Sequence, residues 1–76
     1  MSYDQKAREI LSQVLAIPPE KIDDTVKIGG VKQWDSIAHM NLVLSIEEEV
    51  GRKLHPSEFL EIDSFVSLTR FFEQEE

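Results

Sequence analysis

Residues 34–51 read WDSIAHMNLVLSIEEEVG, and this stretch predicts one long helix over 36–50. Asp and Ser side chains accept hydrogen bonds from the first N–H groups of a helix, so we expect Asp35 or Ser36 to cap it. Gly51 suits the left-handed position that follows a helix, because glycine lacks a Cβ atom. The pattern therefore places the Ser36 hydroxyl in solvent at a helix start, beside free backbone N–H groups that favour an anion.

The apolar side chains of this helix fall on two nearly opposite faces at about 100° per residue. One face holds Leu42, Val43, Ile46 and Val50, with His39 among them. The other face holds Ile37, Met40 and Leu44. One position in a bundle cannot easily bury both faces. The second stripe is therefore either covered by the long loop or a short helix, or exposed as an interaction surface, and we expect it to be exposed.

A first helix is predicted before the proline pair Pro18 and Pro19. Ser2 and Gln5 have the spacing of a capping box. Apolar residues then recur at helical spacing at Tyr3, Ala7, Ile10, Leu11, Val14 and Leu15. The helix should end by Ile17, because proline lacks the N–H group and pushes the residue before it away from helical torsions.

The connection over 18–34 is long but carries apolar anchors at Ile22, Val26, Ile28 and Val31. We expect it to lie against the bundle, with a short helical turn around Glu20 to Asp23. Trp34 at its end is expected to pin the loop to the bundle.

Two more helices are predicted in the last third of the chain. A short one begins at Pro56 and contributes Phe59, Leu60 and Ile62. Asp63 or Ser64 caps a final helix. Its apolar members are Phe65, Leu68, Phe71 and Phe72. The acidic tail over 73–76 is expected to fray into solvent.

These elements predict an all-α fold, a small four-helix bundle of three principal helices plus one short helix, with a long first loop. We expect residues 1–76 to form a single domain, and 41% apolar with 30% charged residues is typical of a globular protein. No stretch is long and apolar enough to span a membrane, and no secretory leader is evident. A cytoplasmic monomer without membrane insertion is therefore expected.

The composition argues against several kinds of chemistry. The chain has no cysteine, which excludes disulfides, cysteine-based zinc sites and a thiol nucleophile of its own. Its net charge of −7 argues against nucleic acid as a partner. The acidic surface either meets basic surfaces of partner proteins or serves only to keep a small protein soluble and monomeric. Arg52 and Lys53 are expected beside the negative end of the 36–50 helix. The acidic residues lack the alternating ligands and turn glycine of a calcium loop, so no metal site is expected.

Residues 35–50 resemble the prosthetic-group helix of acyl carrier proteins, whose signature is Asp-Ser-Leu followed by an apolar and acidic helix. The likeness extends to chain length, helix order, the long first loop and the acidic surface. In that family the serine carries 4′-phosphopantetheine, which a phosphopantetheinyl transferase adds from coenzyme A. The resemblance implies that Ser36 is the attachment residue and that Asp35 orients the site. The protein would then be no enzyme, but a carrier that delivers an acyl group held as a thioester.

The resemblance also implies partner contacts at Ile37, Met40, Leu44, Glu47 and Glu48. The partners would be the transferase, an acyl-loading ligase or transferase, and downstream enzymes with basic docking surfaces. Housekeeping carriers of fatty acid synthesis commonly have Gly before the motif and a second acidic residue after it, where this chain has Trp34 and Ala38. A dedicated biosynthetic pathway is therefore expected, and the cargo stays open among fatty acyl, polyketide, aminoacyl and hydroxyacyl groups. Besides packing, a second role stays open for Trp34, which is to shape the region around the arm or to discriminate among partners.

Two other classes of function use the same residues. A hydrolase would pair Ser36 with His39, but the chain has no Gly-x-Ser-x-Gly elbow and His39 lies toward the core-facing stripe. A non-catalytic acidic helical adaptor would share the exposed apolar stripe and differ only in leaving Ser36 unmodified. His55, just before Pro56, fits a helix start better than a metal ligand.

Overall fold

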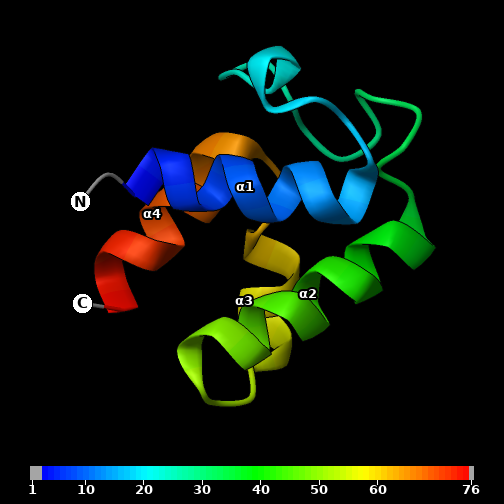
Figure 1. Ribbon diagram of the computed structural model, residues 1–76. Coiled ribbons are helices and arrows are strands. Elements are labelled where there is room, and N and C mark those ends of the chain that lie inside the picture. The colour runs from blue at the N-terminus through cyan, green and yellow to red at the C-terminus, as the bar shows by residue number, and fades with distance from the viewer. Residues whose placement is uncertain (1–2, 76) are drawn as a thin grey trace.

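The computed structural model describes residues 3–75, which fold into four α-helices (Figure 1). The helices are α1 (Tyr3–Leu15), α2 (Ser36–Val50), α3 (Pro56–Glu61) and α4 (Phe65–Glu75), with a 3₁₀ turn, η1, at Pro19–Lys21. No strand forms within the described residues. The all-α fold of three principal helices plus one short helix is thus confirmed. The capping box predicted at Ser2 lies outside the described residues.

Helix α1 packs against both α4 and α2, and Figure 1 shows it crossing in front of α4 and above α2. Its buried side chains are Ala7, Ile10, Leu11 and Leu15, which recur at helical spacing and form one face. Leu42 and Ile46 of α2 and Leu68 and Phe72 of α4 join the same core. Near the start of α1, Lys6 also contacts α4, because its ammonium lies 5.1 Å from the centroid of the Phe72 ring.

The long connection after α1 is tied to the bundle, as expected from its apolar anchors. Ile22, Val26 and Trp34 are buried, whereas Ile28 and Val31 pack partly buried against the core. Two backbone hydrogen bonds join the loop to the start of α4: Ile28 donates to the Asp63 carbonyl (2.8 Å) and Phe65 to the Val26 carbonyl (2.9 Å). The turn expected around Glu20 to Asp23 forms as η1, which begins one residue earlier, at Pro19, and ends at Lys21. The loop is held against both α1 and α4.

The C-terminal end of the chain corrects the prediction of a frayed tail. Ser64 caps α4 by accepting a hydrogen bond from the Ser67 N–H (3.0 Å), and the helix continues through Glu75. Glu75 is not free in solvent, because its carboxylate binds Arg52 at 2.6 Å. This ion pair joins the last turn of α4 to the loop after α2, and Glu76 lies outside the described residues.

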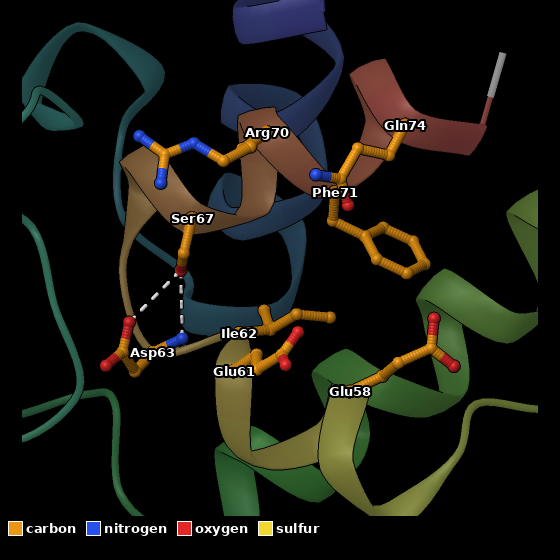
Figure 2. Close-up of a pocket in the computed structure, with 8 residues that line it drawn as sticks. All are labelled: Glu58, Glu61, Ile62, Asp63, Ser67, Arg70, Phe71 and Gln74. Carbon is orange, nitrogen blue, oxygen red and sulfur yellow. Dashed lines mark hydrogen bonds between the residues drawn. The ribbon is translucent and has the colours of Figure 1, made fainter.

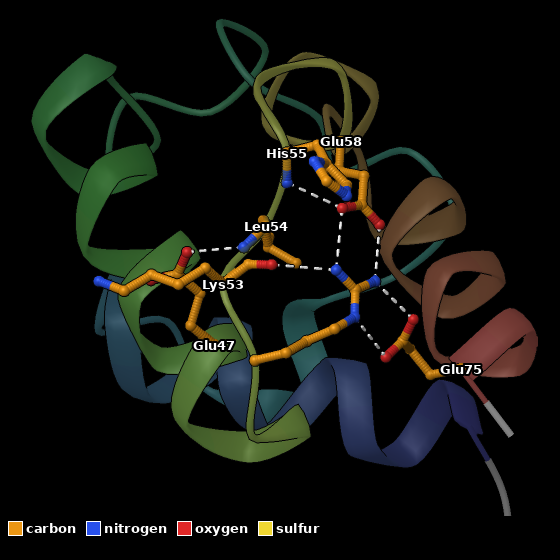
Figure 3. Close-up of polar contacts among 7 residues, drawn as sticks. Glu47, Lys53, Leu54, His55, Glu58 and Glu75 are labelled. Carbon is orange, nitrogen blue, oxygen red and sulfur yellow. Dashed lines mark hydrogen bonds and ion pairs between the residues drawn. The ribbon is translucent and has the colours of Figure 1, made fainter.

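Arg52 joins the loop after α2 to α3 and α4, and Figure 3 shows its partners Glu58 and Glu75. Its guanidinium donates to both oxygens of Glu58 on α3 (2.7 and 3.0 Å) and to both oxygens of Glu75 on α4 (2.6 and 3.1 Å). It also lies 5.8 Å from the centroid of the Phe71 ring. Arg52 does stand beside the negative end of α2, directly after Gly51, but its side chain bonds these two carboxylates, which offer charge-assisted bidentate bonds. The guanidinium holds the pKa of Glu58 down, to about 2, and lowers the pKa of Glu75.

Candidate functional site

Ser36 is the first residue of α2 and is exposed. Asp35 is the N-cap: its backbone is extended (φ −105°, ψ −171°) and its Oδ1 accepts from the Ala38 N–H at 2.9 Å. The Asp35 carbonyl accepts the first helical bond, from the His39 N–H at 2.9 Å. Within the described residues, the N–H groups of Ser36 and Ile37 have no protein acceptor. An accessible hydroxyl thus stands at the positive end of a 15-residue helix.

Trp34 fixes the loop that leads into this helix. Its side chain is 1% exposed, which confirms the predicted packing role. The backbone around it is also bonded, because Trp34 donates to the Val31 carbonyl (3.1 Å) and accepts from the Gly29 N–H (3.2 Å). Gly29 has φ +78°, a torsion that glycine adopts without strain. The position of Ser36 is therefore set by a buried indole two residues before it.

The two apolar stripes of α2 separate as predicted. Leu42 and Ile46 are each 0% exposed and belong to the core. On the other stripe Ile37 is 72%, Met40 58% and Leu44 56% exposed. The alternative in which the loop or the short helix covers the second stripe is therefore wrong. An apolar surface is open to solvent directly beside Ser36.

The carboxylates at the far end of α2 differ from one another. Glu48 is exposed. Glu47 is half-buried, and its Oε2 accepts from the Leu54 N–H at 2.8 Å (Figure 3). Glu47 therefore stabilises the loop between α2 and α3 whatever else it contacts.

An apolar hollow of about 330 Å³ opens next to Ser36, between α2 and α3. We call it the α2–α3 hollow; it is lined by Ile28, Ser36, His39, Met40, Phe59, Leu60, Ile62 and Asp63. The sequence predicts Phe59 and Leu60 only as members of the short helix, not as part of the site. Leu60 is 75% exposed, and a single exposed leucine in the sequence does not signal this use.

His39 does not serve Ser36 as a base. The ring is 4% exposed, and both of its nitrogens are engaged elsewhere. Nδ1 lies 3.0 Å from Trp34 Nε1, and Nε2 lies 2.9 Å from the Phe59 carbonyl oxygen. The arrangement that a serine hydrolase needs, a base bonded to the nucleophile, is therefore not formed by these two residues.

A second hollow, of about 460 Å³, lies between α3 and α4 and is polar (Figure 2). The carboxylates of Glu58, Glu61 and Asp63 stand along its wall, and Asp63 is bonded to the Ser67 hydroxyl. None of the residues predicted for the site lines it. Across residues 3–75 no group of three or more His, Cys, Asp or Glu side chains could hold a metal ion. Nor does any helix in that range combine the length and apolarity needed to cross a membrane.

Comparison with known proteins identifies the family. The family model described as phosphopantetheine attachment site matches residues 5–72, which include all of α2, α3 and the long loop. No curated protein gives a significant match to the chain. Carrier domains of this family bear a covalently attached 4′-phosphopantetheine group and are themselves not catalysts. Because the match covers most of the chain, this protein belongs to the phosphopantetheine attachment site family and is a carrier of the acyl carrier protein type.

Proposed function

We propose that Ser36 is the residue that receives 4′-phosphopantetheine, through a phosphodiester to its hydroxyl. The observation that carries this proposal is the exposed Ser36 at the N-terminus of α2, with the Ser36 and Ile37 N–H groups free of protein acceptors. Three other serines have their hydroxyls in local hydrogen bonds: Ser12 donates to the Ile17 carbonyl, and Ser64 and Ser67 bond each other.

The residues around Ser36 fit this group. A phosphate on the hydroxyl would lie against backbone N–H donors at the positive end of a helix, an arrangement that favours anions. The bound arm supplies a thiol, which holds an acyl group as a thioester and which the cysteine-free chain lacks. Asp35 keeps the helix start ordered through its bond to Ala38, so that the hydroxyl has a fixed position. The α2–α3 hollow offers apolar cover beside the attachment point.

We further propose that the exposed stripe of Ile37, Met40 and Leu44 contacts the partner enzymes, with Asp35, Glu47 and Glu48 at its edges. Between 35 and 50 the chain holds four acidic residues and no Lys or Arg, so this surface attracts basic patches. The partners are a phosphopantetheinyl transferase, an acyl-loading ligase or transferase, and downstream enzymes. We also propose that residues 1–76 form a single carrier domain, and the family match over residues 5–72 supports this.

Trp34 and Ala38 support a dedicated biosynthetic pathway rather than housekeeping fatty acid synthesis. They stand where general carriers commonly have a glycine and an acidic residue. Trp34 is buried and donates a hydrogen bond to His39. This difference from general carriers therefore affects the packing beneath Ser36. We expect the pathway to be identified by the loading enzyme that accepts the modified chain as a substrate.

An adaptor that never carries an arm shares the same surface, so the test is modification itself. The purified chain is incubated with a broad-specificity transferase and coenzyme A, beside Ser36→Ala and the control Ser45→Ala, which alters a serine within the same helix. The intact mass should rise by one phosphopantetheine in the wild type and in Ser45→Ala only. Circular dichroism checks that Ser36→Ala still folds. An unmodified wild type would favour the adaptor.

A further inference from the structure

His39 is a buried titratable residue that the carrier function above leaves without a role. Its ring lies between two fixed groups: Trp34 Nε1 at 3.0 Å from Nδ1 and the Phe59 carbonyl oxygen at 2.9 Å from Nε2. An indole N–H can only donate and a backbone carbonyl can only accept. Nδ1 must therefore be the bare acceptor and Nε2 must carry the proton. The two contacts together select the neutral Nε2–H form of the imidazole.

The two partners of His39 belong to the two sides of the site. Trp34 ends the loop that leads into Ser36, whereas Phe59 lies in α3, the opposite wall of the α2–α3 hollow. The His39 and Phe59 rings also meet edge to face, with centroids 4.7 Å apart. One side chain on α2 therefore contacts both the base of the attachment site and the far wall of the hollow.

Helix α3 depends on few such contacts. It has six residues, and none of them is fully buried. Apart from the His39 bond, a side chain of the loop after α2 holds it through the Arg52 to Glu58 ion pair, at 2.7 Å (Figure 3). That pair is partly exposed to solvent, whereas the His39 ring is 4% exposed. A short helix with little buried surface opens locally at low cost, so the buried His39 contact decides how firmly this wall is held.

We infer that His39 is a positioning residue that joins the Trp34 loop to α3 and thereby fixes the size of the α2–α3 hollow. It selects, through that size, which groups on the arm are sheltered from solvent. This second statement rests on the proposal that Ser36 carries the arm; the first does not. If the His39 ring only filled space in the core, its tautomer would not be fixed. Its substitution would then not affect α3 alone.

The first test uses the unmodified chain. Nitrogen-15 NMR of the wild-type imidazole should show Nδ1 unprotonated and Nε2 protonated at neutral pH. In His39→Leu, which keeps bulk but loses both bonds, the amides of Phe59 and Ile62 should exchange with solvent about tenfold faster, the effect of losing one net hydrogen bond. His39→Gln, whose amide offers one acceptor and one donor, should restore slow exchange.

Three results would overturn the inference. These are the opposite tautomer or a doubly protonated ring at neutral pH, exchange that rises equally in α1 and α4, or failure of His39→Gln to restore α3. If His39→Leu does not fold, Trp34→Phe replaces it, because that change leaves the imidazole and removes the indole donor, together with part of the buried ring volume. Trp34→Phe should then alter the Nδ1 resonance, and an unaltered resonance would contradict the assigned bond.

The second test addresses the cargo with acetyl- and octanoyl-pantetheine arms, loaded by a transferase from the corresponding coenzyme A thioesters. The rate of thioester cleavage by hydroxylamine is measured for both arms on the wild type, His39→Leu and His39→Gln. The ratio of the two rates should change by about threefold or more in His39→Leu and return in His39→Gln. An equal ratio in all three would refute selection by His39. If the wild type accepts no arm, the proposed function fails, whereas the NMR and exchange results still decide the role of His39.

Discussion

Leu42→Ala and Leu44→Ala form a matched pair that tests the two-stripe structure of α2. Both changes remove the same atoms from the same helix, so the difference in helix propensity cancels. Leu42 is 0% exposed in the core, and truncating a leucine there costs about 2 to 5 kcal/mol, from lost transfer energy and the cavity that remains. Leu44 is 56% exposed, and a change at such a position costs within about 0.5 kcal/mol.

These costs are large against the total stability of a small domain. A chain of 76 residues at about 0.05 to 0.15 kcal/mol per residue has roughly 4 to 11 kcal/mol in all. Urea unfolding followed by circular dichroism gives a slope of about 1 kcal/mol per molar for a protein of this size. The midpoint should fall by about 2 M or more in Leu42→Ala and by less than about 0.5 M in Leu44→Ala. Equal midpoint shifts in the two variants would refute the exposed stripe.

Three further predictions concern the surface and the ion pairs. Glu48→Lys should lower the association rate with the transferase a few-fold at low salt, and added salt should remove the difference by screening; a salt-independent rate would place docking elsewhere. Met40→Ala should instead shorten the lifetime of that complex in surface plasmon resonance, and an unchanged dissociation rate would contradict contact there. The Arg52 bonds depress the pKa of Glu58 and Glu75, so they stabilise the fold above about pH 4.5 and the effect fades as pH falls toward 2. In Arg52→Met, the free energy of unfolding should fall less than in the wild type as the pH is lowered from about 4.5 toward 2. The same pH dependence in both proteins would show that other carboxylates dominate.

Much of α2 can be predicted from sequence because its determinants are local. The cap at Asp35, the left-handed Gly51 (φ +78°) and the two stripes all depend on residues within a few positions of one another. Periodicity alone therefore separates buried Leu42 from exposed Leu44. The same locality explains why the sequence pattern is sufficient to place Ser36 at an exposed helix start.

The contacts that periodicity cannot predict join residues far apart in the chain. Arg52 binds Glu75, 23 positions away, and this pair turns a tail expected to fray into the last turn of α4. His39 reaches the Phe59 carbonyl, 20 positions away, so the wall of the hollow does not follow from the sequence pattern either. A basic residue near a helix end is attracted by both the dipole and distant carboxylates, and only the tertiary fold shows which attraction prevails.

The most direct test of the central claim is fragment mass spectrometry of the wild-type chain after reaction with a phosphopantetheinyl transferase and coenzyme A. We expect one phosphopantetheine, carried by a fragment in which Ser36 is the only serine. The group found instead on Ser2, Ser12, Ser45, Ser57, Ser64 or Ser67, or on no residue at all, would contradict this assignment.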